Sequence, residues 1–247
     1  MKEDLLFDNI AMRRSTVFVL AIILGGALGG AVFAVLNFYG GLSEFLVSHR
    51  VSWLATDQTW HRYNRFWVCS VLGWCGFSLY WDAAAKKAGP SKESESRGSR
   101  GVHVVLANVA LLMEVIPVRG LGRFVPVSVL FMGVGLAVQA AGLSIAVWAR
   151  RHLGRNWSGA IAIKVEHRLI RSGPYRVLRH PIYTGILTMY AGTTLVTGEW
   201  LAVIGLAMAI FAYWRKLRLE DAVLAGAFGA EYDAYRRDTW ALVPGLF

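Results

Sequence analysis

Acidic residues and cysteines are scarce in this sequence, and their scarcity narrows the classes of protein that it can encode. Its 247 residues include 16 Asp and Glu against 26 Lys and Arg, a formal net charge of +10. Only two cysteines occur, Cys69 and Cys75, and their spacing matches no metal-binding motif. Two thiols also cannot form the disulfide framework of a small secreted domain. We therefore expect both to be buried residues without a chemical role, and we expect no metal site.

Charged residues of either sign are also few, and long polar stretches are missing. Charged residues make up 17% of the chain, hydrophobic residues make up 55%, and the mean hydropathy is +0.44. Soluble domains contain about 45–50% apolar residues, so this composition is typical of a membrane protein. A basic soluble protein would suggest a nucleic-acid partner. Here the charge fits basic loops beside anionic membrane lipids instead, and we expect no nucleic acid to bind.

A secretory signal is not evident at the start of the sequence. Residues 1–10 carry Lys2, Glu3, Asp4 and Asp8, which do not form the basic region of a signal peptide. No small-residue cleavage site clearly follows the first apolar run. We therefore interpret that run as a retained helix.

Apolar runs of roughly membrane-spanning length recur along the chain. A spanning helix needs about 20 mostly apolar residues. The candidate runs are residues 15–39, 66–81, 102–118, 124–149, 182–197 and 200–214. Only Gly198 and Glu199 separate the last two, which predicts a tight helical hairpin. The expected fold is all-α: a polytopic bundle of about six transmembrane helices.

Basic residues predict the orientation of this bundle. With both ends on the cytoplasmic side, 21 of the 26 Lys and Arg residues lie in cytoplasmic segments. Residues 41–65 then form an outer loop, and residues 83–101 form a flexible cytoplasmic loop. We expect a multi-pass protein of a bacterial inner membrane whose active site faces the cytoplasm. Residues 1–147 and 148–247 would form an N-terminal and a C-terminal region of one structural unit.

Three polar residues inside the expected spans need an explanation. A buried acid such as Glu114 costs about 2.5–3.5 kcal/mol on insertion scales. It is either a substrate-pocket acid or an acid near the outer end of its helix that pairs with Arg119 or Arg123, and we favour the pairing. For Gln139 and Asn108 we expect hydrogen bonds between helices.

Two polar blocks flank the expected hairpin, at residues 172–185 and 215–235, and a hairpin must bring its ends together. His180 precedes Pro181, which suits the first turn of a helix, so His180 lies beside free backbone N–H groups that can hold an anion. Tyr183 lies on the same face. Glu220 could bind an amine or ribose hydroxyls, and Tyr232 and Tyr235 could stack on an adenine or a sulfonium. Residue types alone leave simple juxtamembrane anchoring as an equal alternative.

The ordered motifs in these blocks resemble those of the isoprenylcysteine carboxyl methyltransferase family, which also groups with phospholipid methyltransferases. The likeness covers residues 148–247, and 153–157 resemble the family's preceding segment. The matching residues are Gly173, Pro174, Tyr175, Arg179, His180, Pro181, Tyr183, Gly185, Glu220, Asp221, Leu224, Phe228, Gly229, Tyr232, Tyr235 and Pro244. Two positions depart from the family pattern: Lys216 stands where Arg is usual, and Asp221 stands where Glu is commoner. Lysine does not reproduce a bidentate arginine contact.

The resemblance implies an S-adenosyl-L-methionine-dependent methyltransferase. By position it implies these cofactor-binding residues: Tyr175, Arg179, His180, Tyr183, Gly185, Glu220, Tyr232 and Tyr235. It places Lys216, Arg218 and Glu220 nearest to methyl transfer. The acceptor would be lipophilic and would enter from the bilayer. Prenylcysteine, phospholipid amine, isoprenoid acid and small thiol all stay open as acceptors, and so does the oligomeric state.

Two other functions compete with this interpretation. Membrane sterol reductases, which use NADPH, have a similar Arg-His-Pro element, but a different residue triplet precedes it. A non-enzymatic scaffold or transporter is the other, although the expected spans lack a chain of ionisable residues.

Overall fold

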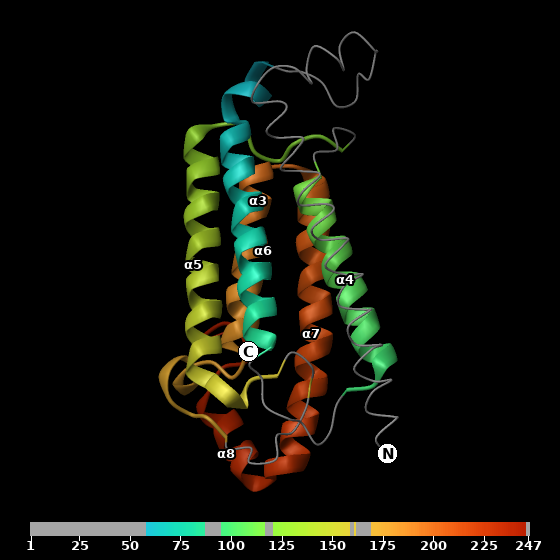
Figure 1. Cartoon of the computed structure of the whole chain (residues 1–247), viewed down its shortest axis with the longest axis vertical. Helices are drawn as coiled ribbons and strands as arrows, with labels where there is room; N and C mark the ends of the chain where they lie inside the picture. The colour runs from blue at the N-terminus through green and yellow to red at the C-terminus, as the bar shows by residue number, and fades with distance from the viewer. Residues whose placement is uncertain (1–57, 87–94, 117–120, 159–160, 162–168, 246–247) are drawn as a thin grey trace. The chain divides into compact units, whose positions relative to one another are not determined.

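The computed structural model describes residues 58–86, 95–116, 121–158, 161 and 169–245. Within these residues the protein is all-helical, with two isolated β-bridges and no strand (Figure 1). The α-helices are α3 (Gln58–Ala85), α4 (Arg97–Val115), α5 (Val129–Leu153), α6 (Pro181–Thr197), α7 (Trp200–Phe228) and α8 (Ala230–Asp238). Short 3-10 helices η2 (Gly154–Asn156) and η3 (Gly173–Arg176) lie between α5 and α6. The expected helix at 15–39 lies outside the described residues.

The chain divides into two compact units, Met1–Cys75 and Gly76–Phe247. Helix α3 crosses this boundary. Helices α4 to α8 all belong to the second unit, and the predicted division into residues 1–147 and 148–247 stays a prediction.

Helices α5 and α6 pack antiparallel through glycines that let the two backbones meet. A Cβ atom placed on Gly142 would lie 2.5 Å from the carbonyl oxygen of Gly185, and one on Gly192 would lie 2.4 Å from the backbone nitrogen of Gln139. Gly135 meets Gly192 in the same way. These contacts repeat every seven residues, so small residues form a continuous seam between the helices. Gly185, predicted as a cofactor contact, lies in this seam.

Helix α7 is the long element of the unit, and Figure 1 shows it extending past the end of α6 toward α8. Hydropathy predicted a helix that ends at residue 214, whereas α7 continues to Phe228. The charged residues that follow Trp214 lower the hydropathy but do not interrupt helical hydrogen bonding, so this boundary was wrong. The chain leaves α7 at Gly229, whose φ of 52° ends the helix.

The other helix ends shift because capping residues, not hydropathy, define them. Ser96 accepts a hydrogen bond from the Ser99 N–H and starts α4 inside the predicted loop 83–101. Ser128 does the same for Phe131, and α5 starts at Val129, five residues after the run at 124 begins. Helix α3 starts at Gln58, within the predicted outer loop 41–65.

Three described helices are long and apolar enough to cross a membrane: α4 over Gly98–Val115, α5 over Val129–Leu153, and α7 over Trp200–Phe228. Helix α6 has 17 residues and is shorter than this. The structure therefore supports an all-helical membrane protein. The count of six spans and the orientation remain predictions.

The structure tests part of the predictions for the polar residues inside the expected spans. Glu114 is buried and accepts a hydrogen bond from Thr194 of α6 at 2.9 Å, while Arg123 pairs with Glu199 at 3.8 Å. Arg119 lies outside the described residues. Asn108 donates to the Val104 carbonyl of its own helix at 2.7 Å rather than to a neighbouring helix. Gln139 is buried at the α5–α6 seam.

The two cysteines differ from the prediction as well. Cys69 is exposed and Cys75 is half-buried, so they are not both core residues. Among the residues that the structure describes, no group of three or more His, Cys, Asp or Glu could hold a metal ion.

Candidate active site

The turn between α6 and α7 brings the two polar blocks together, as predicted. Gly198 adopts a left-handed conformation with φ of 66° and ends α6, and α7 begins two residues later. At the opposite end of this hairpin, His180 Nε2 lies 2.8 Å from Asp221 Oδ1, and His180 Nδ1 lies 3.5 Å from Glu220 Oε2. A histidine from the first block is therefore held between two carboxylates from the second.

Backbone bonds fix the position of this histidine. His180 caps α6 and its N–H donates to the Ala241 carbonyl at 3.1 Å, while the Arg179 N–H donates to the Trp240 carbonyl at 2.8 Å. The Thr184 hydroxyl donates to the Leu242 carbonyl at 2.7 Å. The segment after α8 thus lies alongside residues 178–180 and forms one layer of the site.

Arg179 serves this same connection. Its guanidinium donates to the carbonyl of Arg236 at 3.1 Å and to that of Thr239. It therefore joins the Arg-His-Pro corner to the end of α8. The structure shows this bracing, and the predicted contact between Arg179 and a cofactor stays a prediction.

The charge on His180 follows from its neighbours. Burial disfavours a charged imidazole, but hydrogen bonds to the Asp221 and Glu220 carboxylates outweigh it and raise the pKa of His180 to about 9. The ring is therefore a cation at neutral pH, with both N–H groups directed at carboxylates. The sequence predicted an anion at the start of α6, and the Glu220 and Asp221 carboxylates of α7 lie there.

Tyr183 continues the cluster along α6. Its ring lies parallel to His180 at 5.5 Å with an interplanar angle of 2°, as the predicted shared face requires. Its hydroxyl donates to Glu220 Oε2 at 2.6 Å. Lys216 Nζ lies 5.9 Å from the centroid of the Tyr183 ring, which is a cation–π contact. One aromatic ring therefore links the histidine, an acid and a lysine.

The other tyrosines use their hydroxyls inside the protein. The Tyr232 hydroxyl donates to Asp221 Oδ1, and the Tyr235 hydroxyl donates to the Tyr175 carbonyl at 2.7 Å. Burial raises the pKa of Tyr235 to about 12, and those of Tyr175 and Tyr232 also rise, so all three stay protonated. Both rings of α8 are buried, with centroids 6.1 Å apart, and they support the acid pair. Their predicted stacking on a ligand stays a prediction.

Arg218 is exposed on α7, two residues before Glu220.

A hollow of about 550 Å³ opens between the Arg-His-Pro corner and the end of α8. Its lining residues are Arg179, Asp233, Arg236, Arg237, Asp238, Thr239 and Trp240. Ligand pockets measure about 300–1,000 Å³, so the hollow is large enough for a nucleoside.

Sequence reasoning missed two groups of residues beside this cluster. His103 of α4 is buried against Tyr213 of α7, with ring centroids 4.9 Å apart. Arg150 of α5 stacks on Trp157 at 4.0 Å and donates to the Ala84 carbonyl at 2.9 Å. A lone histidine within an apolar run was the available signal for the first. Nothing local in the sequence indicates the second.

Comparison with known proteins identifies relatives of the C-terminal half. The family model described as phospholipid methyltransferase matches residues 130–231. A probable protein-S-isoprenylcysteine O-methyltransferase of Oryza sativa subsp. indica is 31% identical over 114 residues, 45% of this chain. The chain covers 60% of that rice protein's length. The cobalt-zinc-cadmium resistance protein CzcN of Cupriavidus metallidurans is 36% identical over 116 residues, which are 45% of this chain and 50% of CzcN.

The fold resembles a solved structure along nearly the whole chain. The eukaryotic intramembrane Ras methyltransferase ICMT, solved without a monobody, matches with a TM-score of 0.52 and 16% identity. The match covers 92% of this chain and 96% of that one. At this identity the likeness concerns the fold, and it extends to α4, where the motifs do not reach. Motifs, relatives and fold agree: the C-terminal half of the chain is similar to isoprenylcysteine carboxyl methyltransferases and phospholipid methyltransferases, and the fold resembles that of a membrane methyltransferase.

Proposed function

We propose that this protein transfers a methyl group from S-adenosyl-L-methionine to a lipophilic acceptor at the end of the bundle where α6 begins. The observation that carries the proposal is the cluster of His180, Glu220 and Asp221, because residues far apart in the sequence form it and all belong to the family motifs. The similarity to these methyltransferases supports methyl transfer, and the position of the cluster supports the location of the site.

The residues at this cluster suit a donor that carries both signs of charge. S-adenosyl-L-methionine supplies, when bound, a methyl group on a sulfonium that reacts with a nucleophile without metal assistance. The Glu220 side chain is 31% exposed although its Oε2 is engaged by Tyr183 and His180, so its carboxylate stays accessible to an ammonium or to ribose hydroxyls. Lys216 offers a cation on the other side of the Tyr183 ring.

The protein's own contribution would be orientation, not proton removal. His180 is already protonated and both of its nitrogens face carboxylates, so it is a poor general base. A carboxylate or thiolate acceptor has no proton to lose in the reaction. Holding the reacting groups in line can supply on the order of 7–11 kcal/mol. We assign that role to Tyr183, Lys216 and Glu220. Arg218, which is exposed on α7 two residues before Glu220, would assist them.

A lipophilic acceptor fits the surface that leads to Lys216. Ile210, Phe211 and Trp214 of α7 are each about half exposed and lie within two turns before it. In a bilayer these side chains would face lipid, so an acceptor with an apolar tail could approach Lys216 sideways along α7. The choice among prenylcysteine, phospholipid amine, isoprenoid acid and thiol is not part of the proposal.

A transfer screen tests this function. The purified protein is incubated with methyl-labelled S-adenosyl-L-methionine and lipid extract, and labelled products are identified by mass spectrometry. We expect a labelled product soluble in organic solvent, and we expect S-adenosyl-L-methionine but not NADPH to raise the melting temperature. Labelling of water-soluble acceptors alone would exclude the lipophilic acceptor. Stabilisation by NADPH alone would favour a reductase.

A further inference from the structure

Helix α4 lies outside the family motifs, yet it carries a buried histidine at the site. His103 is 7% exposed and its Nδ1 lies 3.2 Å from the carbonyl oxygen of Ala212 on α7. Burying a polar side chain among apolar helices costs free energy unless it is hydrogen-bonded. The bond to Ala212 offsets this cost, and apolar packing of α4 on α7 alone would not need a histidine here.

The bond reaches the turn of α7 that carries Lys216. In an α-helix the N–H of a residue bonds to the carbonyl four residues earlier, so the carbonyl of Ala212 is also the helical acceptor for Lys216. His103 therefore bonds to the same carbonyl oxygen that accepts the backbone N–H of Lys216. It fixes both the depth and the rotation of this turn relative to α4.

Stacked rings extend this contact into the active-site cluster. The His103 ring meets Tyr213 edge-on at 4.9 Å, Tyr213 lies 5.4 Å from Tyr183, and Tyr183 lies 5.5 Å from His180. Edge-to-face and offset pairs of this kind have preferred geometry. The row of four rings runs from α4 through α7 to α6 and ends at the proposed cofactor site.

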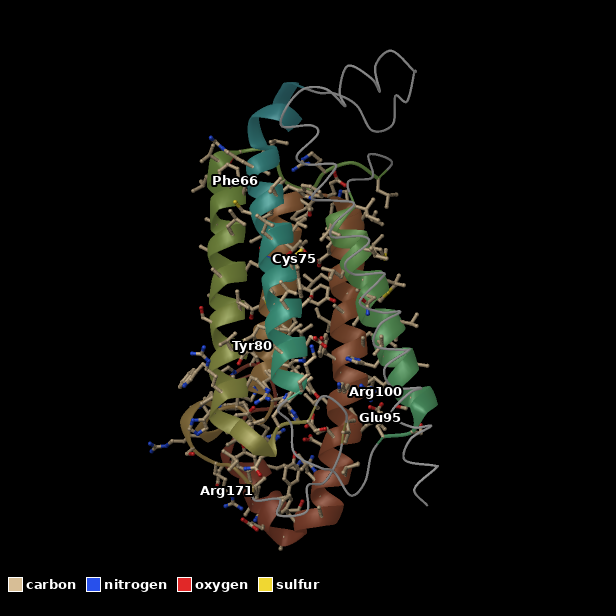
Figure 2. The ribbon with its side chains drawn as sticks, viewed as in Figure 1. Phe66, Cys75, Tyr80, Glu95, Arg100 and Arg171 are labelled. Carbon is tan, nitrogen blue, oxygen red and sulfur yellow. The ribbon has the colours of Figure 1, made fainter. Side chains whose placement is uncertain are left out.

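A second link from α4 lies one turn away. Arg215 donates to the Ser99 carbonyl at 3.2 Å and to the Ser99 hydroxyl at 2.8 Å, and that hydroxyl donates to Glu95 at 2.5 Å. Glu95 and Arg100 both act electrostatically on Lys216. Figure 2 labels these two residues at the end of α4 where the helix begins. The start of α4 is thus bonded to Arg215, the residue next to Lys216.

We propose that His103 is a positioning residue for methyl transfer: through its bond to Ala212 and its contact with Tyr213, it holds Lys216 and Tyr183 in the orientation that the reaction needs. The inference rests on the proposed function. It makes α4 a wall of the active site, although the sequence motifs that identify the family lie only in the C-terminal half.

The test compares three variants with the wild-type protein. His103→Phe keeps a ring against Tyr213 but removes the hydrogen bond, and His103→Asn keeps a donor in place of Nδ1 but removes the ring. Asn108→Leu is the matched control, because Asn108 lies on the same helix and bonds only to Val104 among the contacts described. Loss of one hydrogen bond corresponds to about 0.5–1.5 kcal/mol, or roughly a 2- to 12-fold change.

We expect His103→Phe to lower kcat by about tenfold while KM for S-adenosyl-L-methionine and the melting temperature stay close to those of the wild type. His103→Asn should recover part of kcat, and Asn108→Leu should leave it unchanged. An unchanged kcat in His103→Phe, or a parallel loss of kcat, cofactor affinity and melting temperature, would overturn the positioning role.

A second measurement separates this inference from the proposed function. Reductive methylation of Lys216, followed by peptide mass spectrometry, reports the environment of the lysine without any turnover. We expect faster labelling of Lys216 in His103→Phe than in the wild type or in Asn108→Leu. If the wild type transfers no methyl group, the proposed function fails, yet the labelling still decides whether His103 holds the Lys216 turn. Equal labelling in all three proteins would contradict it.

Discussion

Helix α6 makes two interfaces of opposite character. Against α5 it packs through glycines, with backbone against backbone and the pairs Gly135–Gly192 and Gly142–Gly185 at the closest points. Against α7 it meets charged and aromatic side chains at one end, where His180 and Tyr183 contact Asp221 and Glu220. The first interface leaves no room for adjustment, and the second consists of groups that bind and orient. A rigid seam on one side allows the other side to hold a precise polar geometry.

The largest expected effect comes from filling the seam. Gly142→Ala places a Cβ 2.5 Å from the Gly185 carbonyl oxygen, so the helices must separate. We expect a destabilisation of about 3 kcal/mol, equivalent to a fall of roughly 6–12 °C in melting temperature. Gly133→Ala is the control, since a Cβ there meets nothing within 4 Å. Thermal unfolding in detergent measures both, and equal melting temperatures would refute the close packing of α5 on α6.

Substitution in the polar interface should instead reduce function and spare the fold. His180→Asn removes the cation between Glu220 and Asp221 and leaves two carboxylates to repel one another. We expect kcat/KM to fall by about 100-fold, or about 2.7 kcal/mol. His152→Asn is the control, because His152 is an exposed histidine bonded to Ser172 at 2.9 Å. A wild-type rate in His180→Asn would separate the polar cluster from the reaction.

The same cluster predicts how stability depends on pH. The pKa of His180 is 6.5 in the unfolded chain and about 9 in the folded protein, so the folded state binds the proton more tightly. The resulting stabilisation is complete below pH 6.5 and is lost as pH rises through 9, and it amounts to about 3 kcal/mol. Melting temperatures measured between pH 6 and 10 should therefore fall, and Asp221→Asn should flatten the curve. A wild-type curve as flat as that of Asp221→Asn would mean that His180 is not held as a cation.

The smallest effect concerns the far end of α6, where Thr194 donates to the buried Glu114 carboxyl. Glu114→Gln retains an oxygen that can accept this bond, so we expect little change in stability. Glu114→Leu removes the acceptor and should cost about 1 kcal/mol. Methyl transfer should be unchanged in Glu114→Gln, because the residue lies at the opposite end of α6 from His180. Strong inhibition by this change would give Glu114 the substrate role that the sequence left as an alternative.

The sequence was sufficient to predict the hairpin and the meeting of its two ends. A two-residue connection at Gly198 and Glu199 allows only one arrangement, and the spacing of His180 and Tyr183 places them on one face. Hydropathy did not locate the ends of α7, because charged residues can continue a helix. Nor could it show that Tyr232 and Tyr235 use their hydroxyls within the protein, since that depends on the path of the chain after α8.

The role of α4 was also beyond sequence reasoning. His103 gains its meaning only from Ala212 and Tyr213, which lie more than a hundred residues later. The family motifs identify the C-terminal half, and a tertiary contact of this kind leaves no local pattern. The same holds for Arg150, whose partner Ala84 belongs to the end of α3.

The central claim is that the two blocks form one site for S-adenosyl-L-methionine, and direct binding tests it. Isothermal titration calorimetry with S-adenosyl-L-methionine compares the wild type, Glu220→Gln and Glu231→Gln. Glu231→Gln is the control, because Glu231 pairs with Arg171 on the surface at 3.2 Å. We predict that Glu220→Gln binds at least about tenfold more weakly, a loss of about 1.4 kcal/mol, while Glu231→Gln binds like the wild type. Equal affinity in all three proteins, or no binding by the wild type, would contradict it.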